Sequence, residues 1–221
     1  MSVWAVLVAA GAGHRLGGDR PKAFVALGDL PLLAEPLRRL DESGWIDAIV
    51  VAAPAEWEEP TILLAEELVA TKVVAAVTGG ATRAESVRLA LAEVDDDALV
   101  VLVHDAARPL VTDAVIERVL APLSEGWDGV VPAIPLVDTV KTVDGEHVTG
   151  TVSRDALVAV QTPQAFVAEK LREAYGGDLA GATDCASLLE ARGGRIRWVD
   201  GDPRLLKVTT RADLELVAGW L

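Results

Sequence analysis

The stretch V-L-V-A-A-G-A-G-H-R-L-G-G-D-R-P-K, residues 6–22, decides the fold of this chain. An apolar run leads directly into a loop of small residues, and the cations Arg15, Arg20 and Lys22 follow. Glycine and alanine allow backbone N–H groups to approach a bound group closely, and the nearby cations indicate that this group is anionic. The stretch therefore predicts a strand followed by a phosphate-binding loop.

Length and composition predict one domain that spans residues 1–221. The chain has 221 residues, of which 51% are hydrophobic, and this is enough to bury a full core. No apolar run approaches the roughly 20 residues of a membrane helix, and the run at 3–10 lacks the basic start of a signal peptide. We expect a cytoplasmic protein with no membrane partner.

The net charge and the single cysteine argue against a nucleic-acid-binding protein, an internal disulfide and a zinc site. The net charge of −14 argues against a nucleic-acid partner, which requires a basic footprint. The single cysteine, Cys185, cannot form an internal disulfide, and no Cys/His cluster has the spacing of a zinc site.

Apolar runs and helical patterns alternate along the first part of the chain. We predict strands at 4–9, 48–53, 72–77, 99–104 and 129–134, and helices at 32–43, 61–70, 83–93 and 112–123. Continuous apolar strands separated by helices are typical of an α/β protein with a mostly parallel sheet covered on both faces.

The pattern changes at about residue 135. Residues 139–143 and 148–153, joined by a turn at 144–146, predict a β-hairpin with polar faces, so that residues 136–155 form an arm. Such an arm buries little apolar surface alone, and we expect it to lie against a second subunit. Helices at 167–175, 184–192 and 211–221 and short strands at 196–199 and 205–208 complete the prediction.

Small and polar residues collect after several of these strands. Ligands of parallel sheets bind at the carboxyl ends of the strands. Those ends carry the glycine loop, T-G-G-A-T-R-A-E-S (78–86) and H-D-A-A-R-P (104–109). Asp105 ends the strongest strand and is a natural Mg²⁺ ligand or ribose contact. Lys207 lies in a predicted short strand. Two interpretations are open: a residue at the sheet edge whose charge reaches solvent, or a buried phosphate ligand.

A dinucleotide site is the main rival interpretation of the glycine loop. Gly11, Gly13 and Gly17 satisfy G-x-G-x-x-x-G, but Pro21 would interrupt the required helix and no carboxylate ends the second strand. An NAD-dependent oxidoreductase is therefore disfavoured. The absence of G-K-[ST] excludes a Walker loop. A non-catalytic nucleotide-binding regulator is disfavoured by the cations Arg15, Lys22 and Lys207.

Taken together, the motifs resemble one family over essentially the whole chain. The chain is similar to the 2-C-methyl-D-erythritol 4-phosphate cytidylyltransferases of the non-mevalonate isoprenoid pathway. The resemblance rests on A-A-G-A-G-x-R (9–15), P-K (21–22), G-G-x-x-R-x-x-S (79–86), V-H-D-A-A-R-P (103–109), D-T-x-K (138–141), Q-T-P-Q (161–164), T-D (183–184) and K-V-T (207–209). Val8, Ala81 and Cys185 depart from residues common in that family.

The resemblance implies a Rossmann-like nucleotidyltransferase sandwich of three layers with a protruding β-arm. It implies transfer of a cytidylyl group from CTP to methylerythritol phosphate, with Mg²⁺ as cofactor and a homodimer joined through the arm. The acceptor is an ionised phosphate monoester, so positioning and electrostatic stabilisation suffice and no general base is required. A ribitol 5-phosphate cytidylyltransferase shares the CTP loops and remains the alternative.

The resemblance also assigns roles to individual residues. Arg15, Lys22, Arg154 and Lys207 would be catalytic. Asp105 would be the metal ligand. Substrate-binding roles fall to Ala9, Ala10, Gly11, Ala12, Gly13, Gly79, Gly80, Arg83, Ser86, Asp105, Ala106, Arg108, Thr139, Thr162 and Thr183. The glycine loop would wrap the triphosphate. Thr139 and Arg154, from the partner's arm, would hold the acceptor phosphate together with Lys207.

Overall fold

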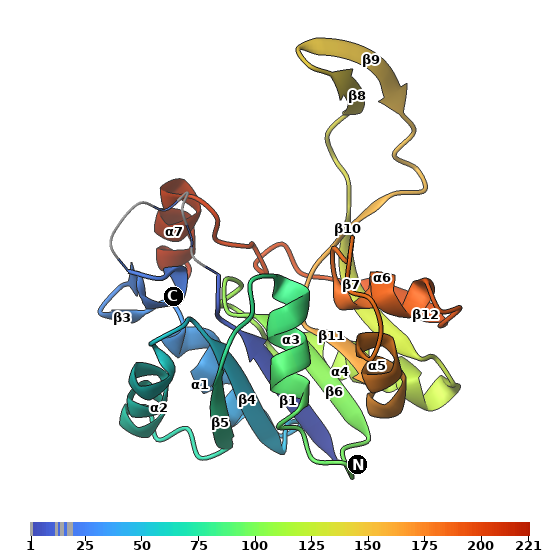
Figure 1. Cartoon of the computed structure of the whole chain (residues 1–221). Coiled ribbons are helices and arrows are strands. Elements are labelled where there is room, and N and C mark those ends of the chain that lie inside the picture. The colour runs from blue at the N-terminus through green and yellow to red at the C-terminus, as the bar shows by residue number, and fades with distance from the viewer. Residues whose placement is uncertain (1, 12, 14–15, 17–19) are drawn as a thin grey trace.

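A single twisted sheet forms the centre of the computed structural model, which describes residues 2–11, 13, 16 and 20–221 (Figure 1). Its strands follow the order β10-β7-β11-β6-β1-β4-β5, with β12 alongside β7. Their bounds are β1 (Val3–Val8), β4 (Ala48–Ala53), β5 (Val73–Thr78), β6 (Val100–Asp105), β7 (Gly129–Pro135), β10 (Val158–Val160), β11 (Gln164–Val167) and β12 (Ile196–Asp200). The pairs β1·β4, β1·β6, β4·β5 and β7·β12 are parallel.

Helices cover both faces of this sheet, as the alternating pattern predicted (Figure 1). The α-helices are α1 (Ala34–Glu42), α2 (Glu58–Glu67), α3 (Arg83–Leu91), α4 (Asp113–Leu120), α5 (Ala168–Tyr175), α6 (Cys185–Glu190) and α7 (Arg211–Ala218). Smaller elements are the 3-10 helices η2 (Lys22–Phe24) and η3 (Ala121–Glu125) and the two-residue strands β2 (Ala26–Leu27) and β3 (Leu30–Pro31). The predicted three-layer α/β fold is confirmed.

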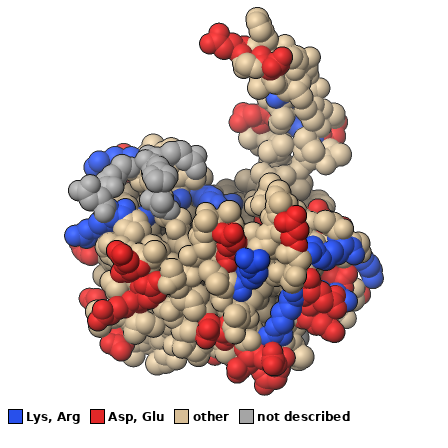
Figure 2. Space-filling model, in the orientation of Figure 1, with Lys and Arg blue, Asp and Glu red and all other residues tan. Residues whose placement is uncertain are grey.

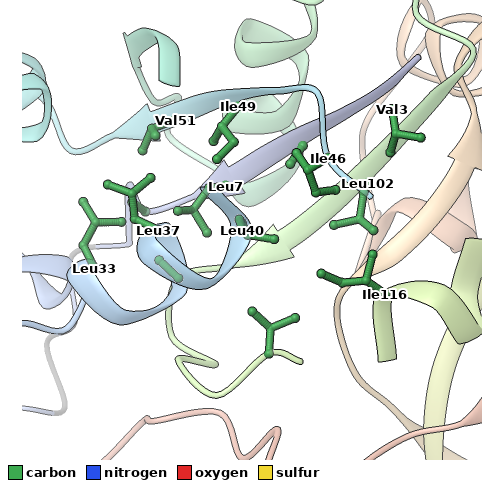
Figure 3. Close-up of a cluster of buried hydrophobic side chains, with 14 of the residues drawn as sticks. Val3, Leu7, Leu33, Leu37, Leu40, Ile46, Ile49, Val51, Leu102 and Ile116 are labelled. Carbon is green, nitrogen blue, oxygen red and sulfur yellow. The ribbon is translucent and has the colours of Figure 1, made fainter. Parts of the chain in front are cut away.

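The side chains of each central strand alternate between two apolar cores. Leu7 of β1 is buried with Leu37 and Leu40 of α1, and α4 packs on the same face (Figure 3). Val6, the neighbour of Leu7, is buried on the opposite face among residues of α3, α5 and α6. Because each strand is covered on both sides, every position of β4 and β6 is buried, which explains their continuous apolar sequences.

The predicted arm is present as a separate two-stranded hairpin. Strands β8 (Val140–Asp144) and β9 (His147–Val152) pair with each other and project from the rest of the chain, which we call the body (Figure 1). Gly145 has φ +55° and allows the tight reversal between the strands. Val143 and Val148 are 65% and 64% exposed, so the arm carries apolar surface that the body leaves uncovered.

The predicted strand at 205–208 is wrong. This segment is irregular: Leu205 N–H donates to the Asp202 carbonyl in a turn, and Val208 N–H donates to the carbonyl of Ala107. Its apolar side chains belong to two different clusters: Leu205 packs in the core that contains α1 and α4, and Val208 packs beside α7. The segment is therefore apolar because of these two packing contacts, and it does not form a strand.

Two antiparallel strands of the central sheet were not predicted. β11 pairs with β6 and β7, and β10 pairs with β7, so the sheet is mixed on that side. Within the described part of the chain, no helix is long and apolar enough to cross a membrane.

Candidate active site

A cavity of about 400 Å³ opens at the carboxyl ends of the parallel strands, where the sheet topology places a ligand. It is lined by the loop after β1, the start of α3, the residues that follow β6, and Lys207. The described lining residues are Val8, Ala9, Ala10, Gly11, Lys22, Ala23, Leu32, Gly80, Ala81, Thr82, Arg83, Ser86, Asp105, Ala106, Ala107 and Lys207.

The described lining of this cavity is cationic, although the chain as a whole has a net charge of −14. Lys22, Arg83 and Lys207 stand against one carboxylate, Asp105. Figure 2 shows acidic and basic side chains interspersed over the visible face of the body, and acidic side chains near the tip of the arm. The local excess of positive charge fits an anionic ligand.

Asp105 joins two of these cations at the centre of the site. Arg83 Nε donates to Oδ1 at 2.8 Å, and Lys207 Nζ donates to Oδ2 at 2.7 Å. The Asp105 side chain is only 8% exposed. Burial alone would raise the pKa of Asp105, but Arg83 and Lys207 outweigh it and hold this pKa well below its usual range. Asp105 is therefore an anion at every physiological pH.

Local structure fixes both cations. Arg83 is the first residue of α3, whose start is closed by a capping box between Thr82 and Glu85. The segment that carries Lys207 is held by the Val208–Ala107 hydrogen bond and by Arg108, whose Nη1 donates to the Leu205 carbonyl at 2.6 Å. Arg108 thus ties together the two loops that meet at Asp105.

A buried network behind the cavity fixes the backbone of Asp105. The Asp105 N–H donates to Thr162 Oγ1 at 3.0 Å, and Thr162 Oγ1 lies 3.1 Å from His104 Nδ1. The other ring nitrogen of His104 faces the Arg108 carbonyl at 2.9 Å and must donate to it, so Nδ1 accepts from Thr162. Burial lowers the pKa of His104 to about 4, and the ring is neutral.

Two glycines permit the close packing of the loops. Gly13 has φ +69°, and a β-carbon there would overlap the side chain of Lys22. A β-carbon at Gly79 would overlap that of Ala10, from the first loop. Ser86 Oγ accepts from the Gly80 N–H at 3.1 Å and donates to the Thr82 carbonyl at 2.9 Å, which shapes the second loop.

The structure gathers most of the predicted site residues that it describes. Those that line the cavity are Ala9, Ala10, Gly11, Lys22, Gly80, Arg83, Ser86, Asp105, Ala106 and Lys207. Others support the lining from behind or beside it: Gly13, Gly79, Arg108 and Thr162. Arg15 and Ala12 lie outside the described residues.

Three described residues of the predicted site neither line the cavity nor support its lining. Thr139 and Arg154 are exposed at the two ends of the arm hairpin, where Arg154 Nη1 donates to the Val137 carbonyl. Thr183 is exposed just before α6.

Sequence reasoning missed six of the lining residues: Val8, Ala23, Leu32, Ala81, Thr82 and Ala107. A signal existed for Thr82, because T-R-A-E (82–85) has the spacing of a capping box. The other five are small or apolar, and nothing in their residue type separates a cavity wall from the core.

The donors at the cavity restrict how a metal ion could bind. In the described part of the chain, no group of three or more His, Cys, Asp or Glu side chains is placed to hold a metal ion. Asp105 is the one carboxylate of the described lining, and each of its oxygens keeps a lone pair beside its cation. This donor set suits Mg²⁺ held mainly by substrate phosphates and water. The metal role of Asp105 stays a prediction.

The fold and the cavity define a class before any comparison is made. The chain folds as a three-layer α/β sandwich around a mostly parallel sheet. A small-residue loop, clustered cations and a buried carboxylate meet at the carboxyl ends of its parallel strands. These features define an α/β protein that binds a phosphorylated ligand.

Comparison with known proteins gives the family. Residues 3–221 match the family model described as IspD: 2-C-methyl-D-erythritol 4-phosphate cytidylyltransferase, and the chain belongs to this family of nucleotidyltransferases.

The relatives agree in sequence and in structure. The chain is 49% identical to the 2-C-methyl-D-erythritol 4-phosphate cytidylyltransferase of Nocardia farcinica, over 97% of this chain and 92% of that protein. It is 46% identical to the one of Saccharopolyspora erythraea over the full length of both. The crystal structure of the Francisella tularensis enzyme superposes with a TM-score of 0.84 at 30% identity, covering 100% of this chain and 99% of that one.

His104 makes the stability of the protein depend on pH. Its pKa of about 4 in the folded chain lies below the value of about 6.5 in an unfolded one. Between these values the unfolded chain binds more protons, so the free energy of unfolding falls as the pH drops from 6.5 toward 4. We expect a loss of about 2 kcal/mol between pH 7 and pH 5 from this residue, measured by urea unfolding.

The variant His104→Asn tests this assignment, because asparagine does not titrate. Its unfolding free energy should change less between the two pH values than that of the wild type. His147→Asn, on the exposed arm, serves as the control and should behave like the wild type. Equal pH dependence of wild type and His104→Asn would contradict the assignment.

Proposed function

We propose that this protein transfers a cytidylyl group from CTP to 2-C-methyl-D-erythritol 4-phosphate, giving 4-CDP-2-C-methyl-D-erythritol and pyrophosphate. The observation that carries the proposal is the cationic cavity around Asp105, in a chain that matches the family model over residues 3–221. The family and its relatives favour methylerythritol phosphate over ribitol 5-phosphate as the acceptor. We place the reaction in the cytoplasm, because it consumes a nucleoside triphosphate.

The chemistry suits a site without a general base. The acceptor phosphate is already ionised, and its oxygen attacks the α-phosphorus of CTP. The bond from this phosphorus to the bridging oxygen breaks, and the electron pair leaves with pyrophosphate. Two anions must approach each other, so the barrier falls when cations are fixed around them. Lys22 and Lys207 line the cavity and supply such charge, and Arg15 is proposed to join them.

Recognition of the nucleoside falls to the second loop. The N–H groups of Gly79 and Gly80 donate to the Ala53 carbonyl and to Ser86 Oγ, so they are used within the protein. The amino group of cytosine is a donor and requires an acceptor. We propose that carbonyl oxygens of the loop at 79–81 accept from the base, while the small residues there leave room for its ring.

We propose Mg²⁺ as the cofactor, held by the triphosphate, by water and by Asp105. When bound, such an ion neutralises charge on the phosphate oxygens. Arg83 and Lys207 keep Asp105 ionised and oriented for this role.

The most direct test measures pyrophosphate release from CTP and Mg²⁺ with each of the two acceptors. We expect turnover with methylerythritol phosphate and a much lower kcat/KM with ribitol 5-phosphate. Faster turnover with ribitol 5-phosphate would replace the proposed acceptor. The absence of turnover with both would refute the proposed function.

Lys22 should be essential for the rate. We expect Lys22→Ala to lower kcat by about 10²-fold or more, because it removes one preorganised cation from the reacting phosphates. Lys170→Ala is the matched control: Lys170 is an exposed lysine of α5 outside the described cavity lining, and its loss should leave kcat unchanged. A Lys22→Ala enzyme with normal kcat and a native melting temperature would remove Lys22 from the catalytic residues.

We propose that two copies of the chain form a homodimer through their arms, which brings Thr139 and Arg154 of each copy to the cavity of the other. Three observations support this: among the described strands, β8 and β9 pair only with each other, Val143 and Val148 are exposed, and Thr139 and Arg154 lie outside the described lining of their own cavity. Lys207 and the partner's arm would then hold the acceptor phosphate together.

Mixing two inactive variants tests the exchange of arms. We expect Lys22→Ala and Arg154→Ala each to be nearly inactive alone. After unfolding and refolding together, mixed dimers would contain one intact site each, and about a quarter of the wild-type activity should return. Sites completed within one chain would instead give no recovery upon mixing, and size-exclusion chromatography with light scattering would show whether dimers formed.

A further inference from the structure

The loop at 54–57, which joins β4 to α2, supplies no residue to the described cavity lining. β4 lies between β1 and β5 and runs parallel to both, so this loop starts at the same edge of the sheet as the cavity. The loops after β1, β5 and β6 all contribute to the lining. The last residue of the loop, Trp57, instead packs against Phe24: the two ring centroids lie 4.4 Å apart, and the ring planes are tilted by 42°.

The backbone around Trp57 is fixed on both sides, and part of it is strained. The Trp57 N–H donates to the Pro54 carbonyl at 3.0 Å and closes a turn. Within this turn Glu56 has φ +67°, a conformation that is unfavourable for a residue with a side chain. The Trp57 carbonyl accepts from the N–H of Thr61 at 3.0 Å and from its Oγ1 at 2.7 Å. The turn and the start of α2 therefore hold Trp57 in place despite the strain.

Phe24, the partner of Trp57, ends the same short turn that Lys22 begins, η2 (Lys22–Phe24). Phe24 is 8% exposed and belongs to the core that contains α1. The carbonyl of Ala23, between these two residues, accepts from the Leu33 N–H at 2.9 Å. Lys22 lines the cavity. One turn thus presents a cation to the cavity and an aromatic ring to Trp57, and a shift of Phe24 is transmitted to Lys22.

We propose that Trp57 is a positioning residue: by packing against Phe24 it fixes η2, and so holds the ammonium group of Lys22 at the phosphates of the bound nucleotide. This inference rests on the proposed function for the identity of the nucleotide and for the catalytic role of Lys22. It gives the loop after β4 a part in the reaction, although this loop has no residue in the described cavity lining.

An aromatic pair that only stabilised the fold would behave differently. Its loss would lower the melting temperature, but the folded molecules would keep their kcat and their affinity for CTP. A pair that positions Lys22 changes both quantities in the folded protein. Its effect also disappears when the Lys22 side chain is removed, because no cation is then left to position.

A double-mutant cycle of Trp57→Ala and Lys22→Ala tests this coupling. The cycle measures kcat by pyrophosphate release and CTP affinity by titration calorimetry, below the melting temperature of every variant. In the wild-type background, Trp57→Ala should lower kcat by about tenfold and weaken CTP binding by about threefold, because a displaced cation no longer matches the transition state. In the Lys22→Ala background, the same change should alter each quantity by less than about twofold.

Three further variants act as controls. Trp57→Phe keeps a ring against Phe24 and should retain kcat within about threefold of the wild type. Trp57→Leu keeps apolar bulk without a ring and should lower kcat in the same direction as Trp57→Ala. It takes the place of Trp57→Ala in the cycle if that variant does not fold, which a thermal melt would show. Leu120→Ala removes a buried side chain from the same core at the end of α4, and should lower the melting temperature while kcat and CTP affinity stay unchanged.

The outcomes separate this inference from the proposed function. The inference is overturned if folded Trp57→Ala, or Trp57→Leu in its place, keeps the kcat and CTP affinity of the wild type, or if it causes the same losses in the Lys22→Ala background. A wild-type protein that binds CTP but releases no pyrophosphate loses the proposed function alone, and the affinities of the cycle then decide the inference. A wild-type protein that does not bind CTP loses both.

Discussion

The buried carboxylate of Asp105 is the constraint on which the site depends. Removing a carboxylate from water costs several kcal/mol unless charge partners compensate it. Arg83 and Lys207 provide that compensation from positions distant in the sequence, one at the start of α3 and one in the segment before α7. Because both must reach Asp105, the end of β6, the second loop and the segment at 205–208 converge and enclose the cavity.

The convergence of these segments also concentrates positive charge at the cavity, although the chain as a whole is acidic. Asp105 neutralises one of its two partners, and Lys22 adds a further cation from η2. Low-dielectric walls of alanine, valine and leucine surround these charges and strengthen their action on a bound anion. The neutral network of His104 and Thr162 fixes the backbone of Asp105 without altering this balance of charge.

Much of the fold was predictable, because strands buried on both faces must be apolar at every position, as in β4 and β6. The same reasoning wrongly predicted a strand at 205–208, because the apolar residues of this segment belong to two separate clusters. In the site, Lys22 and Asp105 were predictable from their place after strands. The contact between Phe24 and Trp57 was not, because aromatic residues far apart in the sequence carry no signal that they pack together. Thr139 and Arg154 lie on the arm and outside the described cavity lining, so their contact with the acceptor stays a prediction.

The titration of the Asp105 side-chain carboxyl carbon, followed by NMR, tests the central claim most directly. If Arg83 and Lys207 hold this carboxylate as described, its resonance shows no protonation step between about pH 6 and pH 3, the range that contains the reference aspartate pKa of about 3.9. The Arg83→Gln variant should move the Asp105 titration upward into this range. An Asp105 that titrates near pH 4 in the wild type would contradict the account, because the ion pairs would then not organise the site.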